Sequence, residues 1–598
     1  MQNQYSLNKA NKSIAVLPFV NMSPDVDNEY FSDGISEEII NALTRVEGLK
    51  VIARTSSFAF KGKNIDIRTI GKELGVATIL EGSVRKSNNQ VRITAQLINA
   101  ADGVHLWSDN FDRQLTDIFQ LQDEVSLLIA DQVRGNVGHF DIQDHLVDQS
   151  TIKVDAYELF LKGRYFQLKW TPDSIKKAVE YYNGSIKIDP TYARSYYGNV
   201  QCYGLLAAWG FMDAREGFEM AGANFLKAKE LDTKLPEYSM SYIGKSFWGD
   251  WDFESSYRQL SQCLMEYPKY SDALEAMAEL CIANGYFSIA EIYIKRALEV
   301  DPLSPNHHYT LGNVNYLQGN FEEALVHIDK CLRTTPEFKL AVELKAMCLI
   351  WLNRKHDFKA CLGNRKDTQL QELLFDAVND ENYEMDKSIL ESWRNVAADK
   401  NQLVPYEIFI LANSNHEDEA MELLWQYVAQ KRGQIINYRY EPFLYKLKER
   451  KDFDALYQAH LKINEMPQIP LIKDNKGSKL NESELELKKE KLEVFIKEKQ
   501  PFLNARLSLT SLAEEINLHP NKLSYLINES YQLNFNEFIN QYRLQHFKQI
   551  AVDQKFAHLT ILGLAYESGF NSKTVFNAFF KKAEGVTPGT WLKSARTA

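Results

Sequence analysis

The chain has 598 residues and a mass of 68.9 kDa, which is enough for about three to five structural domains. Its 45% hydrophobic and 25% charged residues exclude a collagen-like or wholly disordered chain. Averaged over the whole chain, the net charge of −11 argues against a nucleic-acid partner, because affinity for phosphate comes from lysine and arginine.

Cysteine spacing and hydropathy indicate the compartment. The six cysteines stand too far apart in the sequence for a disulfide framework or a zinc site, so we expect buried thiols in a reducing environment. The start of the chain is polar and unlike a signal peptide, and no apolar run reaches the roughly 18 residues of a membrane span. These patterns predict a cytoplasmic protein with no membrane partner.

Residues 13–135 are predicted to form an α/β domain. Short apolar runs at 13–19, 49–53 and 76–84 are predicted to be strands. Apolar and polar residues alternate over 90–98, as in a strand with one face open to solvent. A helix carries Ile39, Ile40 and Leu43, with Asp33 or Ser36 as its cap, and a final helix covers 117–133. Alternating strands and helices favour one compact α/β unit.

Residues 155–465 are predicted to form an all-α solenoid. Pro268, Pro302 and Pro336 are each 34 residues apart, and the pairs Gly285/Gly319 and Ala290/Ala324 keep the same period. A 34-residue period with small residues at the helix crossings is typical of tetratricopeptide repeats. We expect four or five recognisable repeats with degenerate helical pairs beside them. Their concave surface would hold a protein or peptide partner.

Residues 466–480 have the mixed composition of a linker, with two prolines and a glycine. The charged helix that follows is either a solvated spacer or the first structural helix of the last domain, which we place at 481–598. The predicted fold class is thus multidomain: an N-terminal α/β domain, a central all-α tetratricopeptide solenoid and a C-terminal all-α domain.

Two segments of the last domain repeat one pattern. Residues 509–527 and 561–579 align at an offset of 52, so that Ala513 meets Ala565 and Asn517 meets Gly569 at the turn. Each segment is a short helix, a tight turn and a second helix, which is the helix-turn-helix layout. One copy is a weak signal, but two copies joined by a long helix predict a double helix-turn-helix.

Residues 500–594 resemble the DNA-binding domain of the AraC/XylS family. The resemblance lies in the string AYESGFNSKTVFNAFFKKAEGVTPGTW, which carries Ala565, Gly569, Phe570, Phe576, Phe580, Lys581, Gly585, Pro588 and Trp591. It implies two helix-turn-helix units on one linker helix, reading successive major-groove segments of promoter DNA. The chain departs from the family at Ala578, where arginine is frequent, and at Phe547, where alanine is usual.

The candidate DNA-binding residues are positions expected to be exposed on the two recognition helices. Asparagine can pair with an adenine edge, lysine with guanine or phosphate, and serine or threonine with either. The alternative is that these residues are only solvated helix faces. The candidates are Asn521, Lys522, Ser524, Tyr525, Asn528, Ser572, Lys573, Thr574, Asn577 and Lys581.

Local charge reverses the average. Residues 501–598 hold 10 lysines and arginines against 7 acidic residues, so this part carries 10 − 7 = +3 and the remainder carries −11 − 3 = −14. The acidic excess therefore belongs to the first 500 residues, and the net charge of the chain does not exclude DNA.

The first domain also resembles a known family. The strings IAVLPFVNMSPDVDNEYFSDGISEEIINAL and LKVIARTSSFAFKGK are similar to the TolB amino-terminal-like α/β domain, to which no enzymatic role is attached. Its polar motif residues are either turn and strand-end structure or a ligand or partner site. They are Arg54, Thr55, Ser56, Lys61, Glu81 and Arg85.

No catalytic constellation stands out. The sequence contains no phosphate-binding GxxxxGKS loop, no GxSxG elbow and no HExxH zinc helix, and His307–His308 reads as helix surface. We therefore predict a non-enzymatic transcription regulator without a metal or cofactor. The alternatives are a protein–protein scaffold whose last domain has lost DNA binding and, less favoured, an enzyme with its site in the α/β domain. The sequence leaves the oligomeric state open, with a homodimer among the options.

Overall fold

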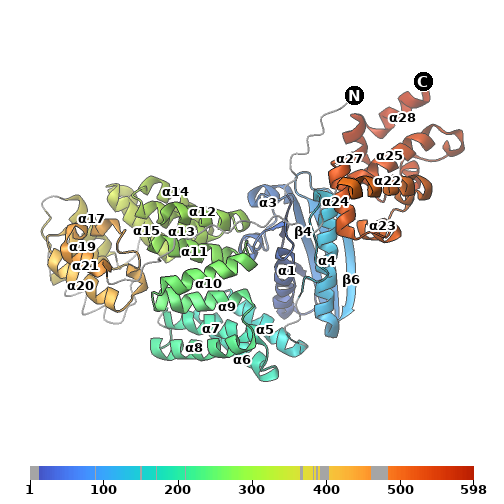
Figure 1. Cartoon of the computed structure of the whole chain (residues 1–598). Helices are drawn as coiled ribbons and strands as arrows, with labels where there is room; N and C mark the ends of the chain where they lie inside the picture. Colours follow the sequence, from blue (N-terminus) through green and yellow to red (C-terminus); the bar gives the residue numbers. More distant parts are fainter. Residues whose placement is uncertain are drawn as a thin grey trace. The chain divides into compact units, whose positions relative to one another are not determined.

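The computed structural model describes residues 12–597 apart from 88, 148–150, 152, 170, 209–210, 364–367, 381–382, 386–387, 391–402 and 459–481 (Figure 1). The chain forms two compact units: residues 1–149 together with 473–598, and residues 150–472. No helix of the described residues is long and apolar enough to cross a membrane. The predicted linker at 466–480 lies outside the described residues.

The first part of the chain forms a mixed sheet with the order β3-β1-β4-β5-β6. Strand β1 pairs in parallel with β3 and β4, the short β2 pairs in parallel with β4, and β4, β5 and β6 form an antiparallel meander. The last strand, at residues 105–114, is not predicted from the sequence pattern. The strands are β1 (Ser13–Val16), β2 (Val20–Asn21), β3 (Lys50–Val51), β4 (Thr78–Ser87), β5 (Gln90–Asn99) and β6 (His105–Gln114).

Two long helices, α1 and α4, pack beside each other on this sheet (Figure 1). In α4 the residues Ile118, Leu121, Val125, Ile129 and Val133 are all fully buried, and their spacing of three and four residues places them on one face. The helices of this part are α1 (Glu29–Thr44), α2 (Arg54–Phe58), α3 (Ile67–Leu74) and α4 (Ile118–Val137).

The start of α1 corrects a prediction. Asp33 and Ser36 lie inside the helix rather than at its N-cap, because α1 begins at Glu29. Their side chains serve tertiary contacts instead: the Asp33 carboxylate pairs with the Lys61 ammonium at 2.7 Å, and the Ser36 hydroxyl oxygen accepts the Phe19 N–H at 2.8 Å. Arg54 likewise pairs with Glu37 of α1 at 3.0 Å. These contacts give Arg54 and Lys61 of the polar motif a structural role.

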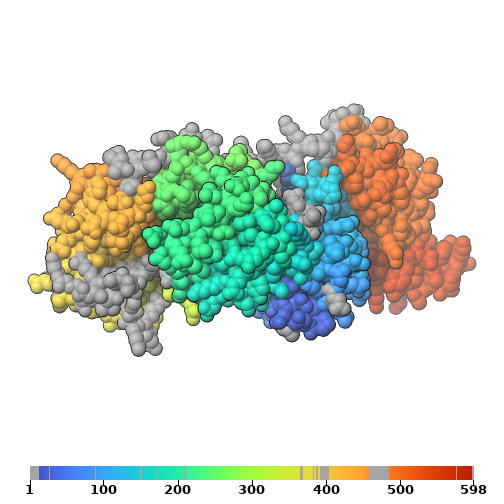
Figure 2. All heavy atoms as spheres, turned by 90° about the horizontal axis from the view of Figure 1, so that it is seen from below, coloured from blue at the N-terminus to red at the C-terminus, as the bar shows by residue number. Residues whose placement is uncertain are grey.

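The unit formed by residues 150–472 begins with helix pairs, and its surface runs from teal through green to yellow and orange in Figure 2. Ala290 and Ala324 are fully buried, and Gly285 and Gly319 adopt φ angles of +79° and +81° after the first helix of their pairs, so the predicted repeat positions are confirmed. The described pairs are α5 (Val154–Gln167) with α6 (Pro172–Ile188), α7 (Ala193–Ala208) with α8 (Ala214–Leu231), α9 (Pro236–Ile243) with α10 (Phe253–Glu266), α11 (Ser271–Ala283) with α12 (Phe287–Val300), α13 (Pro305–Leu317) with α14 (Phe321–Thr334), and α15 (Lys339–Trp351) with α16 (Lys355–Leu362).

Beyond residue 362 the 34-residue period is lost although helices continue. These helices are α17 (Gln369–Asn379), α19 (Tyr406–Asn413), α20 (Glu417–Ala429) and α21 (Lys451–Gln458). Residues from α10 to α21 share one continuous hydrophobic core. The unit is therefore a solenoid of tetratricopeptide-like repeats followed by less regular helices.

The prediction that His307 and His308 lie on the surface is wrong, because both are buried in the solenoid. Burial disfavours charge on His307, but Glu275 at 3.2 Å, together with Asp301 and Asp272, outweighs it and raises the pKa of this imidazole. The imidazole of His308 faces the carbonyl oxygen of Pro302 at 3.0 Å. Both residues therefore fasten the start of α13 to neighbouring segments.

The six cysteines are free thiols in this unit. Five of them are buried, and Cys361 is half-buried. Burial raises the pKa of Cys263 to about 11 and that of Cys202 to about 12. The expectation of buried, unpaired thiols is confirmed for these five residues.

The last domain is entirely helical and has two separate hydrophobic cores. Leu492 and Ile496 of α22 are fully buried in the first core, so this charged helix is the first structural helix of the domain rather than a spacer. The helices are α22 (Glu482–Lys499), α23 (Leu509–Glu515), α24 (Pro520–Tyr531), α25 (Phe535–Val552), α26 (Ile561–Glu567), α27 (Lys573–Glu584) and α28 (Pro588–Thr597).

Candidate nucleic-acid interface

The last domain contains two helix-turn-helix units, α23–α24 and α26–α27, joined by the long helix α25. The turn residues Asn517 and Gly569 both adopt left-handed conformations, with φ of +56° and +87°. Asparagine and glycine tolerate this region best, so the predicted turn positions are confirmed. The first core packs α22–α24 on the first half of α25, and the second packs α26–α28 on its second half.

Side-chain caps define where the helices of both units begin. Ser508 forms a capping box with Ser511 at the start of α23, and the Thr560 hydroxyl oxygen accepts the Gly563 N–H at 3.1 Å at the start of α26. At the recognition helices, His519 caps α24 and Ser572 caps α27. Caps of this kind leave each recognition helix with a defined first turn, which is the part that enters the major groove in helix-turn-helix proteins.

A buried arginine of the linker helix α25 holds the segment at residues 502–504, which precedes α23. The Arg543 guanidinium donates to the carbonyl oxygens of Phe502 at 2.8 Å and Asn504 at 2.9 Å, and burial lowers its pKa to about 10. A Cβ atom at Gly569 would lie 2.1 Å from the same Phe502 oxygen. The carbonyl of Phe502 therefore meets both the linker helix and the turn of the second unit. No local pattern in the sequence marks Arg543 as this anchor, because its two acceptors lie about 40 residues earlier in the chain.

In the second unit the candidate side chains are largely open to solvent. Lys573, Asn577 and Lys581 are exposed, while Ser572 is half-buried and its hydroxyl oxygen caps α27. Thr574 lies within α27, but its side chain is outside the described set. Ala578, at the family's arginine position, is exposed and offers no polar group. The exposed face of α27 can thus present two ammonium groups and one amide.

In the first unit the arrangement differs from the expectation of an exposed face. Lys522 is exposed, but Asn521, Tyr525 and Asn528 are half-buried and Ser524 is only 6% exposed. The end of α4 and the residues after it lie against Asn521, Tyr525 and Asn528. The prediction that Ser524 is exposed is therefore wrong. The sequence predicted which residues share a face of α24, but not that another domain covers that face.

Several basic residues of the domain are engaged in ion pairs. Lys548 pairs with Glu584 at 3.0 Å, and Lys582 pairs with Glu537 at 2.8 Å, which ties α27 to the linker helix. Exposed pairs of this kind contribute little stability and can exchange for phosphate. Lys582 at the end of α27 therefore keeps an ammonium group at the surface of the second helix-turn-helix unit.

His139 lies at the covered face of the first unit. Its ring packs edge-on against Tyr525 at 5.5 Å between centroids. Burial lowers the pKa of His139 to about 4; Asp141 opposes this shift, whereas the charges of Arg134 and Lys12 add to it. The imidazole is therefore neutral at neutral pH in the folded protein.

We expect the free energy of unfolding of the compact unit that contains His139 to fall by about 2.5 kcal/mol, through His139 alone, as the pH is lowered from 6.5 to 4. The unfolded chain takes up a proton at this histidine near pH 6.5, but the folded chain does so only near pH 4, so acid favours unfolding. A His139→Gln variant should lack this loss. The measurement is denaturant unfolding of both proteins across this pH range. His558→Gln, at an exposed histidine, should follow the wild type; a His139→Gln curve parallel to the wild type would contradict the prediction.

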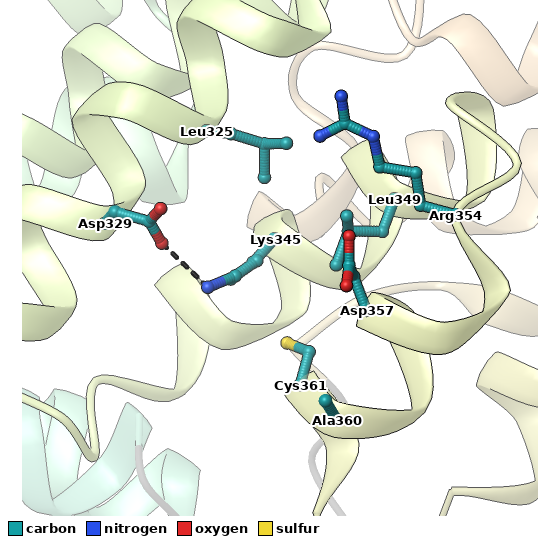
Figure 3. A pocket seen from close by; sticks show the side chains of 8 residues that line it. All are labelled: Leu325, Asp329, Lys345, Leu349, Arg354, Asp357, Ala360 and Cys361. Carbon is teal, nitrogen blue, oxygen red and sulfur yellow. Dashed lines mark hydrogen bonds and ion pairs between the residues drawn. The ribbon is translucent and has the colours of Figure 1, made fainter.

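A hollow of about 330 Å³ lies in the solenoid between α14, α15 and α16 (Figure 3). Its charged side chains are satisfied within the protein: Lys345 pairs with Asp329 at 2.7 Å, and Arg354 pairs with Glu322 at 2.6 Å. The described residues contain no group of three or more histidine, cysteine or acidic side chains that could hold a metal. These observations assign no chemistry to the hollow.

Two family models match parts of this chain. Residues 512–594 match the model of a helix-turn-helix domain, and residues 10–128 match the second domain of HilA/YgeH-like transcriptional regulators. The first match covers both helix-turn-helix units almost completely, and the second covers the sheet and most of α4.

Individual relatives share smaller parts of their length with the chain. A Rhizobium meliloti protein named "Putative adenylate cyclase 3" is 43% identical over 187 residues, which are 31% of this chain and 32% of that protein. The transcriptional regulator HilA of Salmonella typhimurium is 21% identical over 183 residues, 31% of this chain and 27% of HilA. The chain thus spans less than a third of the length of these relatives.

Solved structures of tetratricopeptide proteins are similar to part of the chain. One from Parabacteroides merdae has a TM-score of 0.27 at 14% identity and covers 49% of this chain and 100% of its own. PilF of Pseudomonas aeruginosa has a TM-score of 0.28 at 14% identity and covers 37% and 91%. The repeat assignment itself rests on the helix pairs and their period. The chain therefore combines a domain that matches the second domain of HilA/YgeH-like regulators, tetratricopeptide-like repeats and a C-terminal helix-turn-helix domain.

Proposed function

We propose that this protein is a sequence-specific DNA-binding transcription regulator of the AraC type that acts in the cytoplasm. The observation that carries the proposal is the pair of capped helix-turn-helix units on one linker helix, with left-handed turns at Asn517 and Gly569. Such a pair can place two recognition helices in successive major-groove segments on one side of a duplex.

The second recognition helix supports base reading and phosphate contact together. Asn577 carries the amide that can pair with an adenine edge, and Lys573 and Lys581 can reach guanine or phosphate. All three side chains are exposed, so DNA can approach them without a change in the fold of this unit. We assign Ser572 and Thr574 to phosphate or base contact beside them, and Lys522 to phosphate contact from the first unit.

The repeat unit is proposed to bind a protein or peptide partner whose presence reports a signal to the DNA-binding domain. Stacked helix pairs expose an extended surface that suits such a partner. The proposal includes no catalytic step, since both matched family models describe regulatory or DNA-binding domains. The cyclase name belongs to a relative of which 32% is shared with this chain.

The proposed function is tested by selecting duplexes from a random-sequence pool with the full-length protein. We expect one enriched motif, and we expect its binding to weaken as salt is raised, with a slope that corresponds to several phosphate contacts. Asn577→Ala should reduce the binding free energy by about 1–3 kcal/mol and relax the preference at one base position of the motif. Lys573→Ala should weaken binding to all duplexes if Lys573 contacts phosphate, or relax the preference for guanine at one position if it contacts a base. Lys227→Ala, which removes an exposed lysine of the solenoid, is the matched control. If no motif is enriched over unselected competitor DNA, the scaffold alternative is correct.

A further inference from the structure

The helix α4 has a second face that the sheet does not use. Beyond the residues that pack on the sheet, Arg134 and Gly135 near its C-terminal end are also buried. Arg134 is 3% exposed and pairs with Asp131 at 2.7 Å. Besides this ion pair, the buried guanidinium also contacts Asn521 of the first helix-turn-helix unit.

Asn521 of α24 places its whole amide group against this face. Its Oδ1 accepts hydrogen bonds from the Arg134 guanidinium and, at 3.3 Å, from the Ile142 N–H. Its Nδ2 donates to the Ile142 carbonyl oxygen at 3.2 Å. An asparagine pairs with adenine through the same two atoms, one as donor and one as acceptor. The contact with the α/β domain and a contact with a base are therefore mutually exclusive.

The rest of the same helix face is covered as well. The Tyr525 ring packs against His139, and the Asn528 amide nitrogen lies 3.5 Å from the position of a Cβ atom at Gly138. Because Asn521, Tyr525 and Asn528 are four and three residues apart, they lie along one side of α24. This side is the one that would face the major groove.

Contacts on both flanks hold the covering segment in place. On one side the Thr510 hydroxyl of α23 donates to the Asp131 carboxylate at 3.4 Å. On the other side, the Asn534 and Asn536 amides at the start of α25 donate to the backbone and side-chain oxygens of Asn136 at 2.9 Å and 3.0 Å. The recognition helix thus lies between two anchored edges, and a duplex cannot reach its covered side while they persist.

We propose that the α/β domain masks the first helix-turn-helix unit, so that this unit reads DNA only after the end of α4 leaves α24. The inference rests on the proposed DNA-binding function and adds its regulation. In the masked form the second unit, with Lys573 and Asn577 exposed, reads its half of the site alone. The apparent affinity for the full site is then lowered by the fraction of molecules in which the first unit is free.

Variants on the α4 side test the masking without touching the DNA-reading residues. Arg134→Ala removes one bond to Asn521, and His139→Ala removes the ring that covers Tyr525. Duplexes are first selected from a random pool with the Arg134→Ala protein. We expect each full-length variant to bind these duplexes about tenfold more tightly than the wild type does, and to protect a footprint that is longer by one half-site. Arg113→Ala, which breaks an exposed ion pair with Glu124 at the other end of α4, is the control and should bind as the wild type. Circular dichroism establishes that all variants are folded.

A cross-link provides the opposite perturbation. In a Cys361→Ser background, Asp131→Cys and Thr510→Cys place two thiols across the anchored edge, where a short reductant-cleavable bismaleimide can join them. The cross-linked protein should no longer protect the DNA half-site that the first helix-turn-helix unit reads, and cleavage of the linker should restore this protection. Equal affinities and footprints for wild-type, Arg134→Ala, His139→Ala and joined proteins would overturn the masking but leave the proposed function intact. If no folded protein of the series binds any duplex above competitor DNA, the proposed function and the masking both fail.

Discussion

Replacing Gly569 with alanine is expected to lower the free energy of unfolding of the second helix-turn-helix unit by about 3 kcal/mol or more. Two causes add at this position. The φ angle of +87° disfavours any residue with a Cβ atom. The new methyl group would also lie 2.1 Å from the Phe502 oxygen and 2.9 Å from Leu503 Cα, which are backbone atoms that no side-chain rotation can move.

The contact has a further consequence for Arg543. Any shift of the Phe502 carbonyl away from Gly569→Ala also lengthens its hydrogen bond with the buried Arg543 guanidinium. A charged donor that loses its partner in a buried place is costly, so the backbone cannot relax cheaply. The measurement is chemical denaturation of the full chain with hydrogen exchange read out over α26–α28.

Gly563→Ala is the matched control for this substitution. Gly563 lies in the first turn of α26, and the nearest atom to its added Cβ, the Thr560 hydroxyl oxygen, would be 3.4 Å away. Alanine is the better helix former by up to about 1 kcal/mol, so this variant should be as stable as the wild type or more stable. A Gly569→Ala protein that is as stable as Gly563→Ala would show that the turn does not approach Phe502 as closely as the structure places it.

Truncation of Phe547 to alanine is expected to destabilise the same core by about 3–5 kcal/mol. Phe547 is fully buried, and its ring lies 4.8 Å from that of Phe576 and 5.6 Å from that of Phe580 between centroids. The resemblance to AraC-type domains implies that alanine is usual at this position. The aromatic cluster here is nevertheless built around the phenyl ring, so its removal leaves a cavity that the neighbouring rings cannot fill.

The loss should stay within one half of the domain, because the two halves have separate cores. Hydrogen exchange should rise over α26–α28 while α22–α24 keep their protection. Tyr566→Ala removes a ring of similar size that is half exposed, and it should cost less than about 1 kcal/mol. Uniform loss of protection across the whole domain, or no loss at all, would contradict this account of the core.

Repetition in the sequence was the most informative local signal. The 34-residue period predicted the solenoid, and the offset of 52 residues predicted two helix-turn-helix units with their turns at Asn517 and Gly569. Both signals are local, since they depend on which residues share a face of one helix or stand at one turn. Strand β6 was missed for the same reason: its sequence, HLWSDNFDRQ, is mostly polar and only Phe111 is buried, so the alternation of a strand is absent.

By itself, the sequence determined the type of each domain and which residues lie together on the recognition helices. Periodicity and turn chemistry act within about ten residues, so they are readable without coordinates. Only the tertiary structure decided what covers those faces. The contact between Arg134 and Asn521 joins residues 387 positions apart, and the approach of Gly569 to Phe502 depends on how two separate helices pack. The charge of −11 therefore excluded nothing, and the chain's two recognition helices, equal in sequence pattern, differ in the structure because only one of them is covered.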